Sequence, residues 1–282
     1  MHTVLEILRK TEAWFAEKGV PRARLDAEHL LAHVLGCGRL ELYLRHDMPM
    51  TEEHLADLRP LVRRRASREP LQHILGTWDF HNLNLKIDRR ALVPRQETEQ
   101  LVEEILALAP EPPPGPILDL GTGGGAILLA LLQAWPDLLG IGVDASQEAL
   151  TLAKENAAHC GLQERVSWVH GEWFTPLDRD TLFGLIVSNP PYLTEEEWTV
   201  AEPEVREFDP KPALVAAENG LADAKTILSH AKDHLNPDAW VCLETGITQH
   251  ATLEDHARSL GYQHIQSRKD FSQRPRFFFA KQ

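Results

Sequence analysis

The sequence has little cysteine and no uninterrupted membrane-length apolar run. Its 282 residues include three cysteines, Cys37, Cys160 and Cys242, which lie far apart and match no metal-binding or disulfide spacing. We therefore expect a reducing, cytoplasmic environment. No charged segment followed by an apolar one opens the chain, so we expect no signal peptide. The apolar stretch 117–135 is long enough to imitate a membrane span, but Asp119 and a glycine cluster divide it into a strand and a helix, so we expect no membrane attachment.

An excess of positive charge is also missing. The formal net charge is −13; residues 1–75 carry 12 Lys+Arg and 11 Asp+Glu, whereas the rest of the chain carries 17 and 31. A protein that acts on free DNA normally needs a basic groove for the phosphates. The acidic second part therefore argues against direct nucleic-acid binding and for a protein or small-molecule substrate.

The length of the chain favours two domains, because it exceeds that of a typical single domain. Apolar residues with helical periodicity predict a helical bundle over residues 1–75. Two short runs, 77–80 and 83–87, predict a β-hairpin within a connector of residues 76–95. Residues 96–282 then form the second domain, and no internal repeat or low-complexity tract stands out.

A glycine-rich loop between a strand and a helix marks the second domain. Residues 116–120 have the pattern of a strand, and 126–132 that of a buried helix. The glycines between them permit positive φ and let a ligand approach the main chain. A further strand, 141–144, ends in an acid that can accept hydrogen bonds from both ribose hydroxyls of an adenosine. The candidate cofactor-binding residues here are Asp119, Gly121, Thr122, Gly123, Gly124, Gly125 and Asp144.

Two cofactors fit this loop. Gly121, Gly123 and Ala126 satisfy the dinucleotide pattern G-x-G-x-x-A, which suggests NAD. Asp119-x-Gly121-x-Gly123 also satisfies the pattern of S-adenosylmethionine enzymes, in which the acid lies near the ammonium group of the cofactor. A tight strand–helix turn without a ligand is a third interpretation, and the loop alone does not decide among them.

The stretch Asn189-Pro190-Pro191-Tyr192 follows the apolar strand 183–188. The prolines end the strand and hold the backbone extended, at the sheet edge where open α/β sheets bind ligands. The Asn189 and Pro190 oxygens can accept two hydrogen bonds from a planar NH2 group while the Tyr192 ring covers its face. A dehydrogenase gives this loop no role, whereas a methyltransferase does, because the loop presents a nitrogen nucleophile to a sulfonium methyl group. A plain Pro-Pro turn is the alternative.

With these motifs in place, the chain resembles the release factor glutamine methyltransferase (PrmC/HemK) family over essentially its whole length. Three departures stand out: Gln96 where the family usually has Pro, Gly124 where it usually has Thr, and Thr245 where it usually has His. None of them removes a group that the chemistry requires. The matching segments are 71–76, 94–99, the glycine loop, Asp144, 171–174, 188–192 and 212–216.

The resemblance implies an α/β fold. We expect an N-terminal helical bundle, a β-hairpin connector and a class I methyltransferase domain with a seven-stranded, mostly parallel sheet. It also implies methylation of the side-chain amide nitrogen of the glutamine in the Gly-Gly-Gln motif of class I peptide chain release factors. The methyl donor would be S-adenosylmethionine, the product S-adenosylhomocysteine, and the helical bundle would recognise the protein substrate. We expect a monomer without a metal ion.

The same resemblance assigns roles to single residues. Asn189, Pro190 and Tyr192 would be catalytic, and Pro191 would join them in binding the substrate. Asn189 would also border the cofactor. Trp173 would stack on the adenine ring, although a plain core position is the alternative.

Two other functions remain open from the sequence. An adenine-N6 DNA methyltransferase uses a similar Asn-Pro-Pro-Tyr loop on the amine of a flipped base, but the acidic second part counts against it. A non-catalytic adapter that binds S-adenosylmethionine is the other, and the intact Asp119, Asp144 and Asn189 count against it.

Several charged or histidine side chains are expected to have no catalytic or metal-binding role. His29 and His33 lie one helical turn apart, but Leu30 stands where the zinc-protease pattern needs Glu. The glutamates 195–197 are expected to be solvated, as is the helix face that carries Arg59, Arg63, Arg64, Arg65 and Arg68. Glu97 and Glu99 favour the dipole of the helix that they open, and the sequence leaves any further role undecided.

Overall fold

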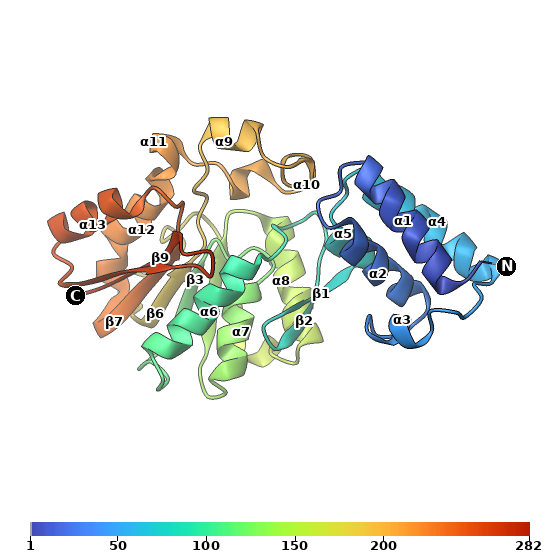
Figure 1. Cartoon of the computed structure of the whole chain (residues 1–282). Helices are drawn as coiled ribbons and strands as arrows, with labels where there is room; N and C mark the ends of the chain where they lie inside the picture. Colours follow the sequence, from blue (N-terminus) through green and yellow to red (C-terminus); the bar gives the residue numbers. More distant parts are fainter. Residues whose placement is uncertain (1) are drawn as a thin grey trace. The chain divides into compact units, whose positions relative to one another are not determined.

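The computed structural model describes residues 2–282 and divides into two compact units (Figure 1). The helical unit comprises the chain up to Thr77 together with Glu202–Phe208, and the sheet unit comprises Trp78–Ala201 and Asp209–Gln282. From the sequence, residues 202–208 are expected to belong to the second domain. In the structure the chain leaves the sheet unit after Ala201, packs into the helical unit, and returns at Asp209.

The two longest helices of the helical unit begin at threonine caps. Thr3 and Thr51 each accept a hydrogen bond from the backbone N–H three residues on, which satisfies a donor that lacks a partner within the helix. Leu8, Phe15 and Leu30 are among the residues of its core. The predicted helical bundle is confirmed. Its helices are α1 (Val4–Glu17), α2 (Ala23–Val34), α3 (Glu41–Leu44), α4 (Glu52–Ala66), α5 (Leu71–Leu75) and α10 (Pro203–Arg206).

The prediction of a solvated basic face is wrong for Arg65 and for Arg68, whose side chain is 17% exposed. The side chain of Arg65 is 5% exposed; its guanidinium donates to Asp26 Oδ2 and to Glu204 Oε1, both at 2.7 Å. Arg68 also donates to Glu204, while Arg63 is exposed as expected. The segment Glu202–Phe208 is the physical reason, because it brings Glu204 into the helical unit from far along the chain.

The sheet unit is built on a seven-stranded sheet with the order β5-β4-β3-β6-β7-β9-β8 over the described residues. The central strands pair in parallel, and β9 runs antiparallel to both of its neighbours. The expected seven-stranded, mostly parallel sheet is confirmed. A separate two-stranded sheet of β1 (Thr77–Phe80) and β2 (Leu83–Lys86) forms the predicted hairpin. The strands of the large sheet are β3 (Ile117–Leu120), β4 (Gly140–Asp144), β5 (Val166–His170), β6 (Phe183–Ser188), β7 (Leu235–Glu244), β8 (His264–Lys269) and β9 (Pro275–Lys281).

Helices cover both faces of this sheet (Figure 1). On β6, Leu185 and Val187 pack into one core and Ile186 packs into the other, which explains why this strand is a continuous apolar run. The first core includes α6 (Gln96–Leu108) and α7 (Ala126–Ala134), and the second includes α12 (Ala222–Ala231) and α13 (His250–Ser259); α8 (Gln147–His159), α9 (Glu195–Thr199) and α11 (Ala217–Gly220) complete the unit.

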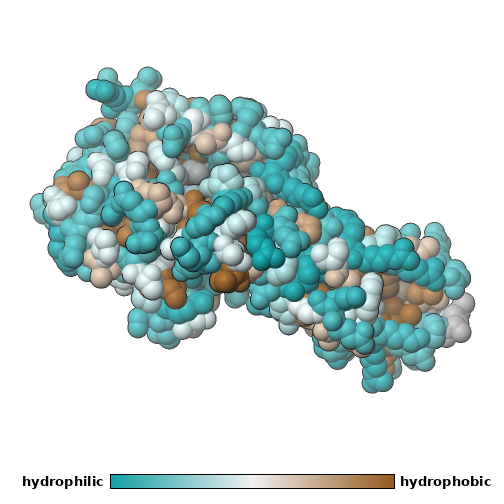
Figure 2. Space-filling view, turned by 90° about the horizontal axis from the view of Figure 1, so that it is seen from above, coloured by the Kyte–Doolittle hydropathy of each residue, from teal (hydrophilic) through white to brown (hydrophobic). Residues whose placement is uncertain are grey.

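The face of the molecule seen in Figure 2 is mainly polar. Figure 2 shows hydrophilic residues over most of the face in view, with small apolar patches among them. None of the helices in the described chain is both long enough and apolar enough to cross a membrane. The glutamates of α9 are exposed, as expected.

Candidate active site

The strands β3, β4 and β6 end at one edge of the sheet, and this edge collects the predicted site residues. Leu120 is paired with Val143 of β4 and with Ser188 of β6. Asp144 and Asn189, which come directly after these two partners, therefore lie at the same edge as the glycine loop, residues 121–125. The register thus brings the two halves of the predicted site together, as expected for an open α/β sheet.

Asp119 is a buried carboxyl group with one unused oxygen. Its Oδ2 accepts a hydrogen bond from the Thr122 hydroxyl at 2.6 Å, whereas its Oδ1 has no hydrogen-bond partner within residues 2–282. Burial raises the pKa of Asp119 to about 7, and the charge of Asp144 adds to the increase. A buried acceptor without a partner is costly, so a bound cation that donates a hydrogen bond would stabilise this group.

The backbone of the glycine loop adopts conformations that favour glycine. Gly121, Gly123 and Gly125 have φ of 66°, 55° and 84°, in the left-handed region that favours glycine. A Cβ on Gly125 would lie 2.8 Å from the Trp168 ring. Gly124 has no positive φ and has ordinary space for a Cβ, so its departure from the family pattern changes little.

Asp144 holds the loop from the next strand. Its Oδ2 accepts a hydrogen bond from Gly123 N and its Oδ1 accepts one from Ser146 N, both at 2.8 Å. Burial raises the pKa of Asp144, and these two bonds oppose the increase. Each carboxylate oxygen has a second lone pair, so this acid can also accept hydrogen bonds from ligand hydroxyls.

Trp173 lies beside the glycine loop. Its ring is 3.5 Å from where a Cβ of Gly121 would be, and its backbone has φ of 49°, which is uncommon for a bulky residue. The side chain is half-buried and packs against the second core. It therefore contributes to the core and also lies next to the loop.

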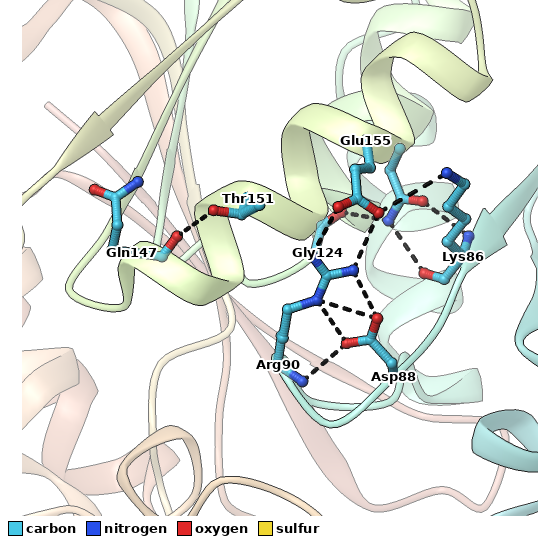
Figure 3. A network of polar contacts seen from close by, with 8 residues as sticks. Lys86, Asp88, Arg90, Gly124, Gln147, Thr151 and Glu155 are labelled. Atoms are coloured by element: carbon cyan, nitrogen blue, oxygen red, sulfur yellow. Dashed lines mark hydrogen bonds and ion pairs between the residues drawn. The ribbon is translucent and has the colours of Figure 1, made fainter.

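One residue that the sequence did not reveal holds the glycine loop to the hairpin. The buried Asn156 accepts a hydrogen bond from Lys86 N at 2.8 Å and donates to Gly124 O at 2.9 Å. Figure 3 shows the surrounding network, in which Arg90 pairs with both Asp88 and Glu155. The sequence does hold an indication of this role, because Asn156 is a polar residue on the apolar face of a predicted helix.

A second group missed by the sequence analysis lies behind the Asn-Pro-Pro-Tyr loop. The Asn189 side-chain amide donates to Thr98 Oγ1 at 3.2 Å, and the Thr98 hydroxyl donates to Glu244 Oε2 at 2.8 Å. The Tyr192 hydroxyl donates to Glu244 Oε1 at 3.1 Å. Burial raises the pKa of Tyr192, so its hydroxyl stays protonated at neutral pH. Within the described chain, neither Asn189 Oδ1 nor the Pro190 carbonyl oxygen accepts a hydrogen bond.

The acids at the start of α6 have partners of their own. Glu99 accepts a hydrogen bond from His81 N at 3.0 Å, and Glu97 pairs with Arg274 at 3.2 Å. Gln96 occupies the first helical position, where Pro is common because the N–H there has no partner within the helix. The departure at Gln96 therefore leaves the helix start intact.

Across residues 2–282, no group of three or more His, Cys, Asp or Glu side chains is arranged to hold a metal ion. His29 and His33 thus form no such group, and the three cysteines are free thiols.

Comparison with known proteins identifies the family. The model of the PrmC N-terminal domain matches residues 6–76, and that of the methyltransferase small domain matches residues 97–205. The release factor glutamine methyltransferase of Geobacter sulfurreducens is 43% identical over 251 residues, which cover 89% of this chain and 87% of the relative. The Vibrio cholerae enzyme is 40% identical, and the match covers 96% of this chain and 93% of the relative. The Escherichia coli enzyme is 38% identical, and the match covers 90% of each chain. The chain belongs to the release factor glutamine methyltransferase family.

Membership of this family confirms the resemblance found in the sequence, and it makes the chain a methyltransferase rather than a dehydrogenase. Solved structures agree on the fold. The N-terminal domain of human METTL16 in complex with SAH matches with a TM-score of 0.54 at 14% identity, over 95% of this chain and 93% of that one. The T. thermophilus 16S rRNA methyltransferase RsmC, in complex with AdoMet and guanosine, matches with a TM-score of 0.53 at 18% identity, over 73% and 49%.

Proposed function

We propose that this enzyme transfers a methyl group from S-adenosylmethionine to the side-chain amide nitrogen of the glutamine in the Gly-Gly-Gln motif of class I peptide chain release factors. S-adenosylhomocysteine is the second product. The observation that carries the proposal is the pair of free acceptors, Asn189 Oδ1 and the Pro190 carbonyl, beside a glycine loop in a chain of this family.

The residues at the sheet edge fit the cofactor. Asp119 Oδ1 supplies an acceptor for its ammonium group, and Asp144 supplies acceptors for its ribose hydroxyls. The glycine loop leaves room for close approach of its amino-acid end, while Trp173 offers a ring face for adenine. When bound, the cofactor supplies an electrophilic methyl group on a sulfonium sulfur.

The Asn-Pro-Pro-Tyr loop would activate a weak nucleophile, the amide nitrogen of the substrate glutamine. The lone pair of an amide nitrogen is delocalised into the carbonyl, so the nitrogen reacts poorly. Asn189 Oδ1 and the Pro190 carbonyl oxygen would accept hydrogen bonds from the two N–H groups of the substrate amide. These bonds would turn the nitrogen lone pair toward the methyl group and stabilise the positive charge that develops on nitrogen. Tyr192 and Pro191 would border the amide plane, and alignment would supply much of the rate.

The carboxylate that contacts the Asn-Pro-Pro-Tyr loop, that of Glu244, is not free to act as a strong base. Both oxygens of Glu244 are engaged by the hydroxyls of Thr98 and Tyr192. Methylation makes the amide N–H strongly acidic, so the proton can leave to water. The reaction therefore needs acceptors that orient and stabilise the amide rather than a general base.

The helical domain is proposed to recognise the release factor. Residues 1–75 would form the recognition domain, 76–95 the connector and 96–282 the methyltransferase domain, with 202–208 returning to the helical unit. A folded partner needs an interface larger than one side chain provides, and the helical unit offers such a surface. The enzyme is proposed to act as a cytoplasmic monomer.

A methyl-transfer assay tests the proposal with three acceptors. Intact release factor should be methylated, whereas the same factor with its motif glutamine replaced, and duplex DNA, should not. Transfer to duplex DNA would favour an adenine-N6 methyltransferase. Binding of S-adenosylmethionine without transfer to any acceptor would favour an adapter.

A further inference from the structure

Thr98 and Glu244 form a buried group directly behind Asn189. Thr98 is 4% exposed and lies in the first turn of α6; Glu244 is 1% exposed and ends β7. Because β7 pairs in parallel with β6, with Leu243 opposite Ser188, Glu244 reaches the same sheet edge as the Asn-Pro-Pro-Tyr loop.

The polarity of these hydrogen bonds fixes the direction of the Asn189 amide. An ionised carboxylate only accepts hydrogen bonds, so the Thr98 hydroxyl donates its single proton to Glu244 Oε2. Thr98 Oγ1 can then only accept in its second contact. The Asn189 atom that faces it at 3.2 Å must therefore be the NH2 group, which leaves Oδ1 free on the opposite side.

We propose that Glu244 and Thr98 are positioning residues that hold the oxygen of the Asn189 carboxamide toward the amide of the substrate. This inference rests on the proposed function. A carboxamide rotated by half a turn would present its NH2 group to the NH2 group of the substrate, and two donors cannot bind each other. The orientation of Asn189 thus decides whether it can accept a hydrogen bond from the nucleophile.

The ionisation of Glu244 gives the arrangement a dependence on pH. Burial raises its pKa, and this increase is opposed by the hydroxyls of Thr98 and Tyr192 and by the charge of Arg276, while Glu97 adds to it. A protonated Glu244 can donate to Thr98 Oγ1, which frees the Thr98 hydroxyl to donate to Asn189 Oδ1 and favours the rotated carboxamide. Methyl transfer should therefore fall as the pH falls through the raised pKa.

Substitutions at Thr98 test the proposal. Thr98→Val keeps the shape of the side chain but removes the hydroxyl, and Thr98→Ser retains it. Thr226→Val is the matched control, because that hydroxyl donates to Ala222 O within α12, away from the loop. Single-turnover methyl transfer to intact release factor is measured at saturating cofactor across pH, with KM and cofactor affinity measured in parallel.

Thr98→Val should lower the transfer rate by about 10- to 100-fold, the range found when an outer partner of a functional ligand is removed. Cofactor affinity should stay unchanged and KM should change little, while Thr98→Ser and Thr226→Val should keep nearly the full rate. The acid limb of the wild-type pH profile should be absent from Thr98→Val and from Glu244→Gln, whose carboxamide does not titrate in this range. A purely structural role would lower the rate without changing the shape of the profile.

A wild-type rate in Thr98→Val, or an unchanged acid limb in either variant, would overturn the proposal. If Thr98→Val does not fold, the pH profile of Glu244→Gln alone tests the proposal. A wild-type enzyme that fails to methylate release factor would overturn the proposed function, and with it the role assigned to the Asn189 oxygen.

Discussion

Replacing Asp119 with asparagine should stabilise the ligand-free enzyme and weaken its binding of the cofactor. The side chain is fully buried and its Oδ1 has no hydrogen-bond partner within the described chain. Asparagine keeps the shape and can still accept the hydrogen bond from Thr122, but it carries no charge. The substitution therefore removes the cost of burying a carboxylate and, at the same time, the partner of the cofactor's ammonium group.

The magnitude follows from the pKa of Asp119, which rises from an ordinary 3.8 to about 7 in the folded protein. At about 1.4 kcal/mol per unit, the buried charge costs roughly 4 kcal/mol above pH 7. Because the folded state holds the proton more tightly than the unfolded state, stability from this group is complete below the unfolded pKa and is lost as the pH rises through 7. Between pH 5 and pH 8 the wild type should lose about 2–3 kcal/mol that Asp119→Asn retains.

Chemical denaturation at several pH values measures the first effect as the difference between wild type and Asp119→Asn. Calorimetry at pH 7 in buffers of different ionisation enthalpy measures the second. Binding should displace up to about half a proton from wild-type Asp119 and none from that site in the variant, whose affinity should be about 10- to 100-fold weaker. Parallel pH dependence of the two proteins, or equal proton release, would refute the reasoning.

Three further changes probe other parts of the structure. Asp144→Ala should weaken cofactor binding by about 10- to 100-fold, because it removes charged hydrogen bonds of roughly 1.5–3 kcal/mol; unchanged affinity in calorimetry would remove Asp144 from the site. Asn189→Ala should slow single-turnover methyl transfer by about 100- to 1000-fold, by analogy with the loss of one oxyanion-hole donor, with a smaller effect on cofactor affinity; near-normal turnover would contradict the acceptor mechanism. Arg65→Met should cost about 3–5 kcal/mol in urea unfolding, because it leaves Asp26 buried without its cation. The control Arg63→Met, on the exposed face of the same helix, should change stability by less than about 0.5 kcal/mol.

The parts of the site that the sequence predicted are those formed by short contiguous segments. The glycine loop and the Asn-Pro-Pro-Tyr loop each follow an apolar strand, so their placement at a sheet edge followed from local pattern alone. Gly121, Gly123 and Gly125 all have the positive φ that glycine permits. Local chemistry was sufficient for this placement because glycine and proline constrain the backbone of each loop locally.

The contacts that the sequence did not predict join distant segments. Thr98 and Glu244 are separated by 146 positions, and nothing in either local pattern indicates that they meet. Arg65 was expected on a solvated face because its neighbours along α4 are basic, whereas Glu204 covers it from a segment 139 residues away. Such pairings depend on the register of the sheet and on the path of the chain. The periodicity of residues along the sequence predicts neither.

The most direct test of the central claim is fragmentation mass spectrometry of release factor after incubation with the enzyme and S-adenosylmethionine. The account predicts one added methyl group, on the side chain of the glutamine in the Gly-Gly-Gln motif, and its loss when Asn189 is replaced by alanine. A methyl group on another residue, or an unmodified factor in the presence of enzyme that binds the cofactor normally, would contradict it.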